Sequence, residues 1–169
     1  PWKGVPTFIE AAAGLPASAY ILVVGGEGVQ LEKIRADMKK NAVRGQAIGR
    51  VDPAVVPEYF AASDVIVIPN SAVTKISREY TSPLKLFEAL AAGKAIVASD
   101  IPSLREVLDD DTAMFVPPDN AQALRQALAR LASDREKRAA LSAHAKERAA
   151  RYDWTARSMR ILDRLKIVS

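Results

Sequence analysis

The chain has 169 residues, which is enough for one domain with a sizeable hydrophobic core. Hydrophobic residues make up 49% of it and charged residues 26%, as is typical of a globular protein in water. Because the sequence has no cysteine and only one histidine, it excludes disulfides, thiolate metal sites, cysteine nucleophiles and histidine-rich metal sites.

The net charge of +4 is unevenly distributed. Residues 1–119 carry 12 basic and 15 acidic side chains, a net charge of −3, whereas residues 120–169 carry 12 basic and 5 acidic ones, a net charge of +7. The basic C-terminal part is either a solvated helix surface or a surface attracted to an anionic membrane or a phosphorylated partner. Nucleic acid is disfavoured as a partner, because no aromatic residues interleave with the basic ones.

Segments typical of helices and strands alternate along residues 1–119. A helix within residues 1–15 comes first. The predicted strands that follow are 19–24, 47–49, 65–68, 95–99 and 113–116, and the helices between them are 29–40, 54–62, 83–93 and 103–108. Residues 70–81 lack a clear period and are predicted to form a polar loop. Beyond residue 119 the pattern is helical, over about 120–132, 134–151 and 154–166.

This alternation predicts an α/β domain over residues 1–169, with a Rossmann-like, doubly wound parallel sheet in 1–119 and a helical tail in 120–169. In such a sheet, helices connect parallel strands. The leading helix therefore predicts a further strand just upstream of Pro1, in a longer parent protein.

Ligands of parallel sheets bind beyond the carboxyl ends of the strands. One predicted strand runs directly into Gly25-Gly26-Glu27-Gly28 and then a helix. Glycines allow a ligand to approach the backbone, and free amides at a helix start favour an anion. A plain tight turn explains these glycines equally well, so this loop alone does not identify a site.

The helix predicted to begin at Pro83, with Ser82 as its N-cap, carries Lys85 in its first turn. Helix dipoles disfavour a cation there. An anion such as a diphosphate at this helix end would explain the lysine. The alternative is that Lys85 is exposed to solvent and destabilises the helix only slightly. Glu88 lies on the same helix among apolar neighbours, so its carboxylate needs partners, either the hydroxyls of a ribose or Lys85 in a structural ion pair.

The stretch from Ser82 to Pro102, Ser-Pro-Leu-Lys-Leu-Phe-Glu-Ala-Leu-Ala-Ala-Gly-Lys-Ala-Ile-Val-Ala-Ser-Asp-Ile-Pro, resembles the signature of retaining glycosyltransferases of family 4. Lys3-Gly4, the glycine loop and Gly49-Arg50-Val51 resemble further motifs of that family. The resemblance implies one half of a two-domain GT-B fold, namely the C-terminal donor-binding domain, without the N-terminal acceptor domain.

The resemblance also implies roles for individual residues. Lys3 and the helix start would hold the diphosphate of a nucleotide-sugar, Glu88 its ribose, and Arg50 and Val51 its base. The implied catalytic residues are Lys3 and Glu88, and the implied donor-binding residues are Lys3, Gly26, Gly28, Arg50, Val51, Thr81, Ser82, Pro83, Leu84, Lys85 and Glu88. Transfer would retain the anomeric configuration and use neither metal nor other cofactor.

One position departs from the family pattern, which has a second glutamate eight positions before Glu88. That position is Tyr80 here, and Glu79 is adjacent. The contact to the sugar is therefore less well specified than the contacts to the nucleotide.

The sequence thus predicts a metal-independent hexosyltransferase acting on a glycan or lipid-linked acceptor, in the cytoplasm or peripherally at the inner face of the membrane. The isolated chain is expected to bind a nucleotide-sugar without transferring it. A non-catalytic Rossmann-like nucleotide-binding module and a nucleotide-sugar epimerase of the same architecture are the alternatives.

Overall fold

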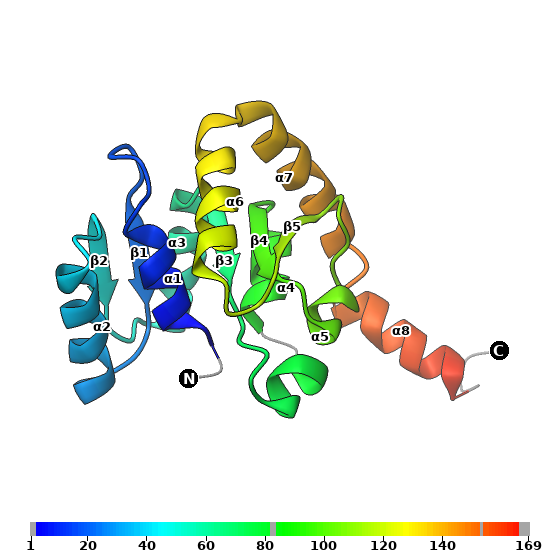
Figure 1. Cartoon of the computed structure of the whole chain (residues 1–169). Helices are drawn as coiled ribbons and strands as arrows, with labels where there is room; N and C mark the ends of the chain where they lie inside the picture. Colours follow the sequence, from blue (N-terminus) through cyan, green and yellow to red (C-terminus); the bar gives the residue numbers. More distant parts are fainter. Residues whose placement is uncertain (1–2, 82–83, 153, 166–169) are drawn as a thin grey trace.

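The structure is a computed structural model that describes residues 3–81, 84–152 and 154–165. Helices and strands alternate up to β5, after which three helices follow (Figure 1). In chain order the elements are α1 (Val5–Ala12), β1 (Ile21–Val24), α2 (Gly28–Lys40), β2 (Gly45–Ile48), the 3-10 turn η1 (Pro53–Val55), α3 (Val56–Ala62), β3 (Val65–Ile68), the π-helical turn η2 (Ile76–Tyr80), α4 (Leu84–Ala91), β4 (Ala95–Ser99), α5 (Pro102–Arg105), β5 (Ala113–Val116), α6 (Ala121–Ser133), α7 (Arg135–Ala149) and α8 (Trp154–Arg164).

All strand pairs are parallel, which confirms the predicted α/β class, but the strands form two sheets instead of the expected one. β1 pairs with β2, from Ile21 opposite Gly45 to Val24 opposite Ile48. The other sheet has the order β3-β4-β5, with Val65 opposite Ala95 and Ile96 opposite Ala113. No ladder joins β1 to β3 among the described residues.

The core is densest around β4, the middle strand of the larger sheet. All five residues of β4 are buried, as expected for a short apolar strand covered on both faces. One face packs against Leu86 and Leu90 of α4, and the other against Leu131 of α6 and Leu141 of α7.

Helix α1 connects the two sheets. Its Phe8, together with Leu15 just after the helix, packs against the cluster around β1 and β2 and also against the cluster beside β4. Figure 1 shows α1 in front of the space between β1 and β3.

The end of α4 follows the sequence prediction. Gly93 has φ +60°, its amide donates to the Leu90 carbonyl (3.0 Å), and the Lys94 amide donates to the Ala89 carbonyl (3.2 Å). These two bonds form a Schellman motif, for which glycine is the preferred residue. The predicted cap at the other end, Ser82 and Pro83, lies outside the described residues.

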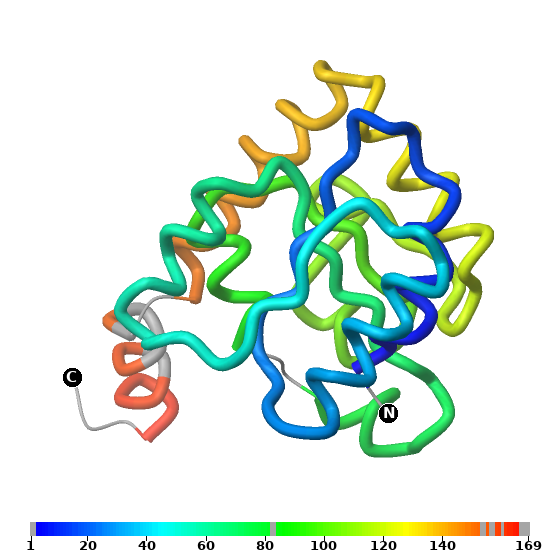
Figure 2. Tube along the Cα trace, turned by 90° about the vertical axis from the view of Figure 1, so that its left-hand side faces the viewer, coloured from blue at the N-terminus to red at the C-terminus, as the bar shows by residue number. Residues whose placement is uncertain are grey.

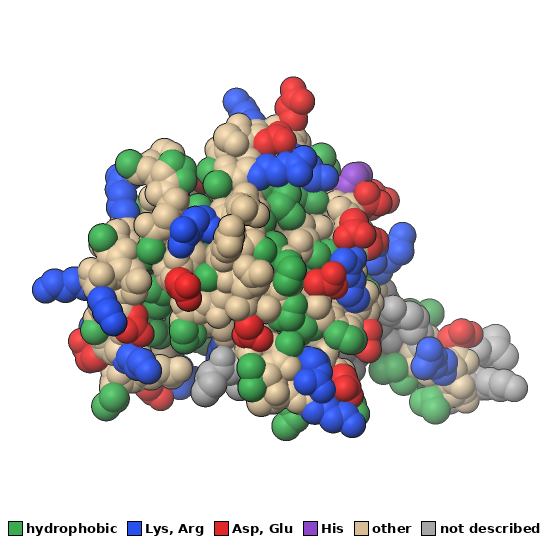
Figure 3. Space-filling model, in the orientation of Figure 1, with side chains coloured by type: hydrophobic (Ala, Val, Ile, Leu, Met, Phe, Trp, Pro, Cys, Tyr) green, Lys and Arg blue, Asp and Glu red, His purple; other side chains and the backbone are tan. Residues whose placement is uncertain are grey.

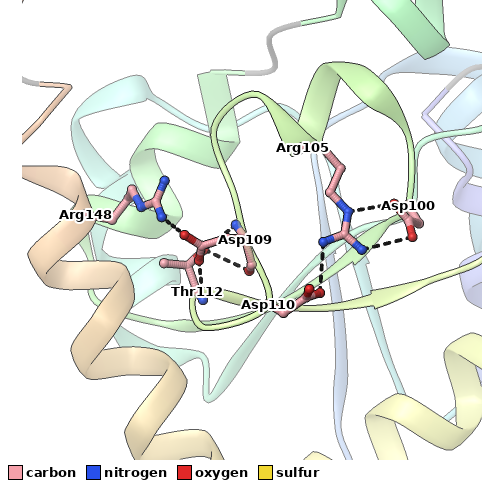
Figure 4. A network of polar contacts seen from close by, with 6 residues as sticks. All are labelled: Asp100, Arg105, Asp109, Asp110, Thr112 and Arg148. Atoms are coloured by element: carbon pink, nitrogen blue, oxygen red, sulfur yellow. Dashed lines mark hydrogen bonds and ion pairs between the residues drawn. The ribbon is translucent and has the colours of Figure 1, made fainter.

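Two arginines stabilise the turns between β4, α5 and β5 (Figure 4). Arg105 donates to Asp100 (2.7 Å) and Asp110 (2.9 Å), and its guanidinium lies 3.6 Å from the centre of the Phe115 ring. The hydrogen bond from Arg105 lowers the pKa of Asp100. Arg148 of α7 pairs with Asp109, which also accepts from the amide and hydroxyl of Thr112. We infer a structural role for this network.

The C-terminal helices differ in how they are placed. α6 and α7 pack on the domain, whereas α8 extends away from it (Figures 1 and 2). On the face drawn in Figure 3, basic side chains are interspersed with acidic ones and form no single continuous patch. None of the helices in the described ranges combines the length and the apolar character needed to cross a bilayer.

Candidate binding site

The predicted site residues that the structure describes lie at or near the ends of β1, β2 and β3 and the start of α4. The glycine loop follows β1, and Gly49, Arg50 and Val51 follow β2. These two loops touch, because the Gly25 amide donates to the carbonyls of Ile48 (3.0 Å) and Gly49 (3.3 Å).

The glycine loop has the open backbone that ligand contact requires. Gly25, Gly26 and Gly28 have φ values of 106°, 87° and 53°, a region that favours glycine. A Cβ atom on Gly25 or Gly28 would meet no atom within 4 Å, so it is the backbone conformation, and not packing, that favours glycine there. Helix α2 begins at Gly28 without a side-chain cap. The first amides of a helix have no partner within the helix, so a helix start without a side-chain cap is suited to binding an anion.

Arg50 and Val51 lie beside this loop, with Arg50 exposed and Val51 half-buried. This arrangement offers a cation and an apolar surface next to the helix start. The resemblance implies that these two residues contact the base of the donor.

Lys3 and Gly4 reach the site from the chain start. Gly4 has φ +65°, and a Cβ atom there would lie 1.6 Å from the Pro69 carbonyl oxygen. Glycine is therefore required for the chain to pass this closely over the end of β3. This contact holds the exposed Lys3 at the same edge as α4.

Lys85 and Lys3 lie close enough for their charges to repel each other. Lys85 is half-buried, and burial, together with the positive charge of Lys3, lowers its pKa from 10.5 to about 8. Two like charges near each other disfavour the charged form of each, and a bound anion would offset that repulsion. Lys85 was identified from the sequence because a helix dipole disfavours a cation in the first turn. The positive charge of Lys3 further disfavours the charged form of Lys85.

Glu88 lies one turn further along α4 and is half-buried. No ion pair joins it to Lys85 among the described residues, so the structural ion pair considered above is not formed. Its carboxylate remains available for other partners. Leu84, expected within an apolar helix face, is 71% exposed because it lies in the first turn, beyond the packed part of α4.

The segment before α4 is folded and not the irregular loop expected, since residues 76–80 form a π-helical turn. The Thr81 hydroxyl donates to the Ile76 carbonyl (2.9 Å), and the Ser103 hydroxyl donates to the Ser77 carbonyl (3.1 Å). The first bond closes the end of the turn, and the second attaches the turn to α5.

The two candidates for the missing glutamate are both on this turn. Glu79 lies 3.8 Å from Lys75 and from Arg78, in two long ion pairs, and Tyr80 is 69% exposed. The structure brings neither into contact with Lys85 or Glu88 through any hydrogen bond or ion pair that it describes.

Asn70, directly after β3, is a polar residue that sequence reasoning did not single out. It is fully buried, and within the described part of the chain neither its amide nitrogen nor its oxygen has a hydrogen-bond partner. An unpaired buried amide costs about 1–3 kcal/mol. Its position after a strand, at the edge where ligands gather, was the only sequence signal that could have identified it.

A hollow of about 580 Å³ lies elsewhere, between α2 and the outer edge of β2. It is lined by Arg35, Lys39 and Gln46 among others. None of the predicted site residues lines it, so we assign the candidate site to the strand ends and not to this hollow.

Comparison with known proteins identifies relatives of this chain. Residues 1–148 match the family model described as glycosyl transferases group 1. The chain is 33% identical to phosphatidyl-myo-inositol mannosyltransferase from Mycolicibacterium smegmatis. The match covers the whole of this chain and 43% of that relative. It thus spans less than half the length of this curated relative.

Solved structures show the same fold. The chain superposes with a TM-score of 0.84, at 22% identity, on Anabaena Alr3699/HepE in complex with UDP-glucose, covering 99% of this chain and 46% of that one. It also resembles sucrose-phosphate synthase from Thermosynechococcus elongatus, with a TM-score of 0.81 and 28% identity over 98% of this chain and 43% of the other. These structures are GT-B glycosyltransferases, and the matched part is their C-terminal domain, which confirms the predicted fold.

Proposed function

Since the chain belongs to the group 1 glycosyl transferase family, we propose that it is the donor-binding domain of a retaining glycosyltransferase. In this proposal the parent protein transfers a sugar from a nucleotide-sugar to a glycan or lipid-linked acceptor. The observation that carries it is the pair Lys3 and Lys85, two mutually repelling cations at the start of α4 that a diphosphate would neutralise.

Each part of the donor has a matching group in the chain. Lys3, Lys85 and the first amides of α4 and α2 hold the diphosphate. Glu88 accepts hydrogen bonds from the ribose hydroxyls, and Arg50 and Val51 lie against the base. When the bond between sugar and diphosphate breaks, negative charge develops on the leaving diphosphate, and the two lysines stabilise it. They supply the positive charge that a metal ion supplies in other transferases, so we propose metal-independent transfer.

The comparisons suggest probes for the donor and the acceptor. One structural neighbour is in complex with UDP-glucose, and one relative is named as a mannosyltransferase of a phosphatidyl-inositol. A uridine nucleotide is therefore the first donor to test. We further propose that the parent enzyme acts in the cytoplasm, with peripheral contact at the inner face of the membrane.

Calorimetric titration of the full-length protein with UDP, GDP, ADP and dTDP, each free and sugar-linked, tests the proposal. We expect one base to bind with a dissociation constant at least tenfold below the others, since Arg50 and Val51 present a fixed surface to the base. No binding to any of the eight ligands would overturn the proposal.

Transfer itself is expected to need more than this chain, because acceptors in a two-domain architecture bind the other domain. The purified chain of residues 1–169 is expected to show no measurable sugar transfer in a radiolabelled-donor assay, while the full-length protein does. Transfer by the chain alone would contradict the proposal that the acceptor binds the other domain. Conversion of the donor without any acceptor would indicate an epimerase.

Nucleotide affinity is expected to depend on pH through Lys85. Its pKa of about 8 means that the unliganded site loses this positive charge as the pH rises through 8, whereas a bound diphosphate favours the charged form. Affinity should therefore be constant below pH 8 and fall by up to about tenfold per pH unit above it. Titrations between pH 7 and 9.5 measure this.

The variant Lys85→Arg is the matched control, because arginine stays charged throughout this range. Its affinity should be nearly independent of pH between 7 and 9.5. A parallel decline in wild type and Lys85→Arg would show that another group titrates.

A further inference from the structure

The π-helical turn η2 and the residues beside it carry exposed apolar side chains next to the candidate site. Four large ones are between 69% and 81% exposed, namely Val73, Ile76, Tyr80 and Leu84. Ile76 and Tyr80 lie four residues apart in the turn, which places them on the same side of it. Leu84 begins α4 directly before Lys85, so these apolar side chains border the proposed diphosphate site.

The fold does not depend on these apolar side chains. In the part of the chain that the structure describes, none of the four packs against the three core clusters. Polar groups hold the turn instead, since the Ser77 amide donates to the Thr74 hydroxyl (3.2 Å) and the Arg78 guanidinium donates to the Ala72 carbonyl (3.1 Å). A turn held in this way can carry polar side chains on its outer side, so the apolar ones there need another explanation.

This part of the molecule projects from the domain and carries positive charge. Figures 1 and 2 show the turn, in green at the lower edge, beyond the ends of the strands. In Figure 3, hydrophobic and basic side chains lie beside each other at this lower edge. Two cations of the turn share one carboxylate, because Lys75 and Arg78 each lie 3.8 Å from Glu79. We call these two cations and the four apolar residues the η2 surface.

The composition of the η2 surface is that of a protein surface at a membrane. Tyrosine and aliphatic side chains enter the boundary between lipid headgroups and acyl chains, and long cationic side chains reach anionic headgroups. A glycan would instead need hydrogen-bond partners for its hydroxyls, which Val73, Ile76 and Leu84 do not offer. A projecting surface also cannot enclose a small ligand, whereas it can contact a broad one such as a bilayer.

We propose that the η2 surface contacts an anionic membrane and holds the candidate site close to it, so that the acceptor is lipid-linked and not a free glycan. This inference rests on the proposed function, because it selects between the two acceptor classes named there and assigns the membrane contact to particular residues. The acceptor reaches the start of α4 from the membrane, past Leu84.

Co-sedimentation of the full-length protein with phospholipid vesicles, without nucleotide, tests the membrane contact. We expect stronger binding to vesicles that contain phosphatidylglycerol than to vesicles of phosphatidylcholine alone. Ile76→Glu should lower the partition coefficient about tenfold, because its carboxylate would face anionic headgroups. Lys75→Gln should lower it about fivefold, and only on the anionic vesicles.

Tyr20→Glu is the matched control, because it adds the same charge at another exposed apolar position. Tyr20 is 53% exposed and precedes β1, at the opposite ends of the strands. This variant should bind vesicles as the wild type does. Absence of vesicle binding by the wild type, or equal losses in Tyr20→Glu and Ile76→Glu, would overturn the proposal. Loss of binding in Ile161→Glu of α8 without loss in Ile76→Glu would assign the contact to α8 and contradict it as well.

Two further measurements separate this inference from the proposed function. Nucleotide titration of Ile76→Glu without vesicles should give the wild-type affinity. If the wild type binds no nucleotide, the proposed function fails, whereas nucleotide binding without vesicle binding overturns only the membrane contact.

The acceptor class is measured with the preferred sugar-linked nucleotide, labelled in the sugar, and membranes of the source organism. With the full-length protein, the label should enter the fraction extracted by chloroform and methanol. Label found only in water-soluble glycan would contradict the lipid-linked acceptor.

Discussion

The variant Glu88→Ala is expected to bind a nucleotide about 1–3 kcal/mol more weakly than wild type, which is roughly fivefold to 150-fold in dissociation constant. The reason is the loss of hydrogen bonds from two ribose hydroxyls to a charged acceptor. Glu88 is half-buried on α4 and has no ion pair with Lys85 among the described residues. Calorimetric titration with the preferred nucleotide measures the change.

Glu88→Gln is the control, because it preserves the shape of the side chain and one acceptor oxygen. It should lose less affinity than Glu88→Ala. Both variants should unfold at the wild-type temperature when no nucleotide is present, since the carboxylate makes no ion pair with any described residue. Unchanged affinity in Glu88→Ala, or a lowered melting temperature without nucleotide, would show that Glu88 is structural instead.

The variant Gly4→Ala is expected to lower the free energy of unfolding by about 2–5 kcal/mol, and to weaken nucleotide binding. A left-handed backbone costs a non-glycine residue on the order of 1–2 kcal/mol, and overpacking adds about 1–3 kcal/mol. The overlap here is with a backbone atom, the Pro69 carbonyl oxygen, 1.6 Å from the added Cβ atom. The segment must therefore move, and Lys3 moves with it. Urea unfolding of the full-length protein and nucleotide titration measure the two effects.

Gly28→Ala separates the two causes. Gly28 also has a positive φ, of 53°, but a Cβ atom there meets nothing within 4 Å. This variant should lose only about 1 kcal/mol, the conformational part of the cost. If both variants are destabilised equally, the close contact with Pro69 has no energetic role.

Much of the fold was predictable because its signals are local. Four consecutive β-branched residues identify β3, and Gly93 identifies the end of α4 through a conformation that only glycine adopts readily. Other boundaries depend on contacts that the sequence does not display. β2 begins at Gly45 and not at Ala47, because a residue without a side chain is needed where a Cβ atom would lie 2.0 Å from the Ile21 carbonyl oxygen. The helix predicted over 103–108 is shorter in the structure, where α5 ends at Arg105. Val107 and Leu108 are buried in the core after the end of the helix, so their apolar character reflects core packing and not a helical face.

The same distinction applies to the candidate site. Lys85 was identifiable because a cation in a first helical turn violates a local preference. The π-helical turn at 76–80 was not, because hydrogen bonds from Thr81 and Ser103 hold it and its residues have no helical period. Asn70 was missed for a similar reason, since nothing in its neighbours indicates that its amide is buried without a partner.

The glycine loop extends from the sheet of β1 and β2, whereas α4 packs on the sheet of β3, β4 and β5. A nucleotide that contacts both sheets would hold them together. Bound ligand stabilises a folded protein by about 2.7 kcal/mol at a hundredfold excess over its dissociation constant. Here that stabilisation would oppose separation of the two sheets, so the domain would be most rigid with the proposed nucleotide bound.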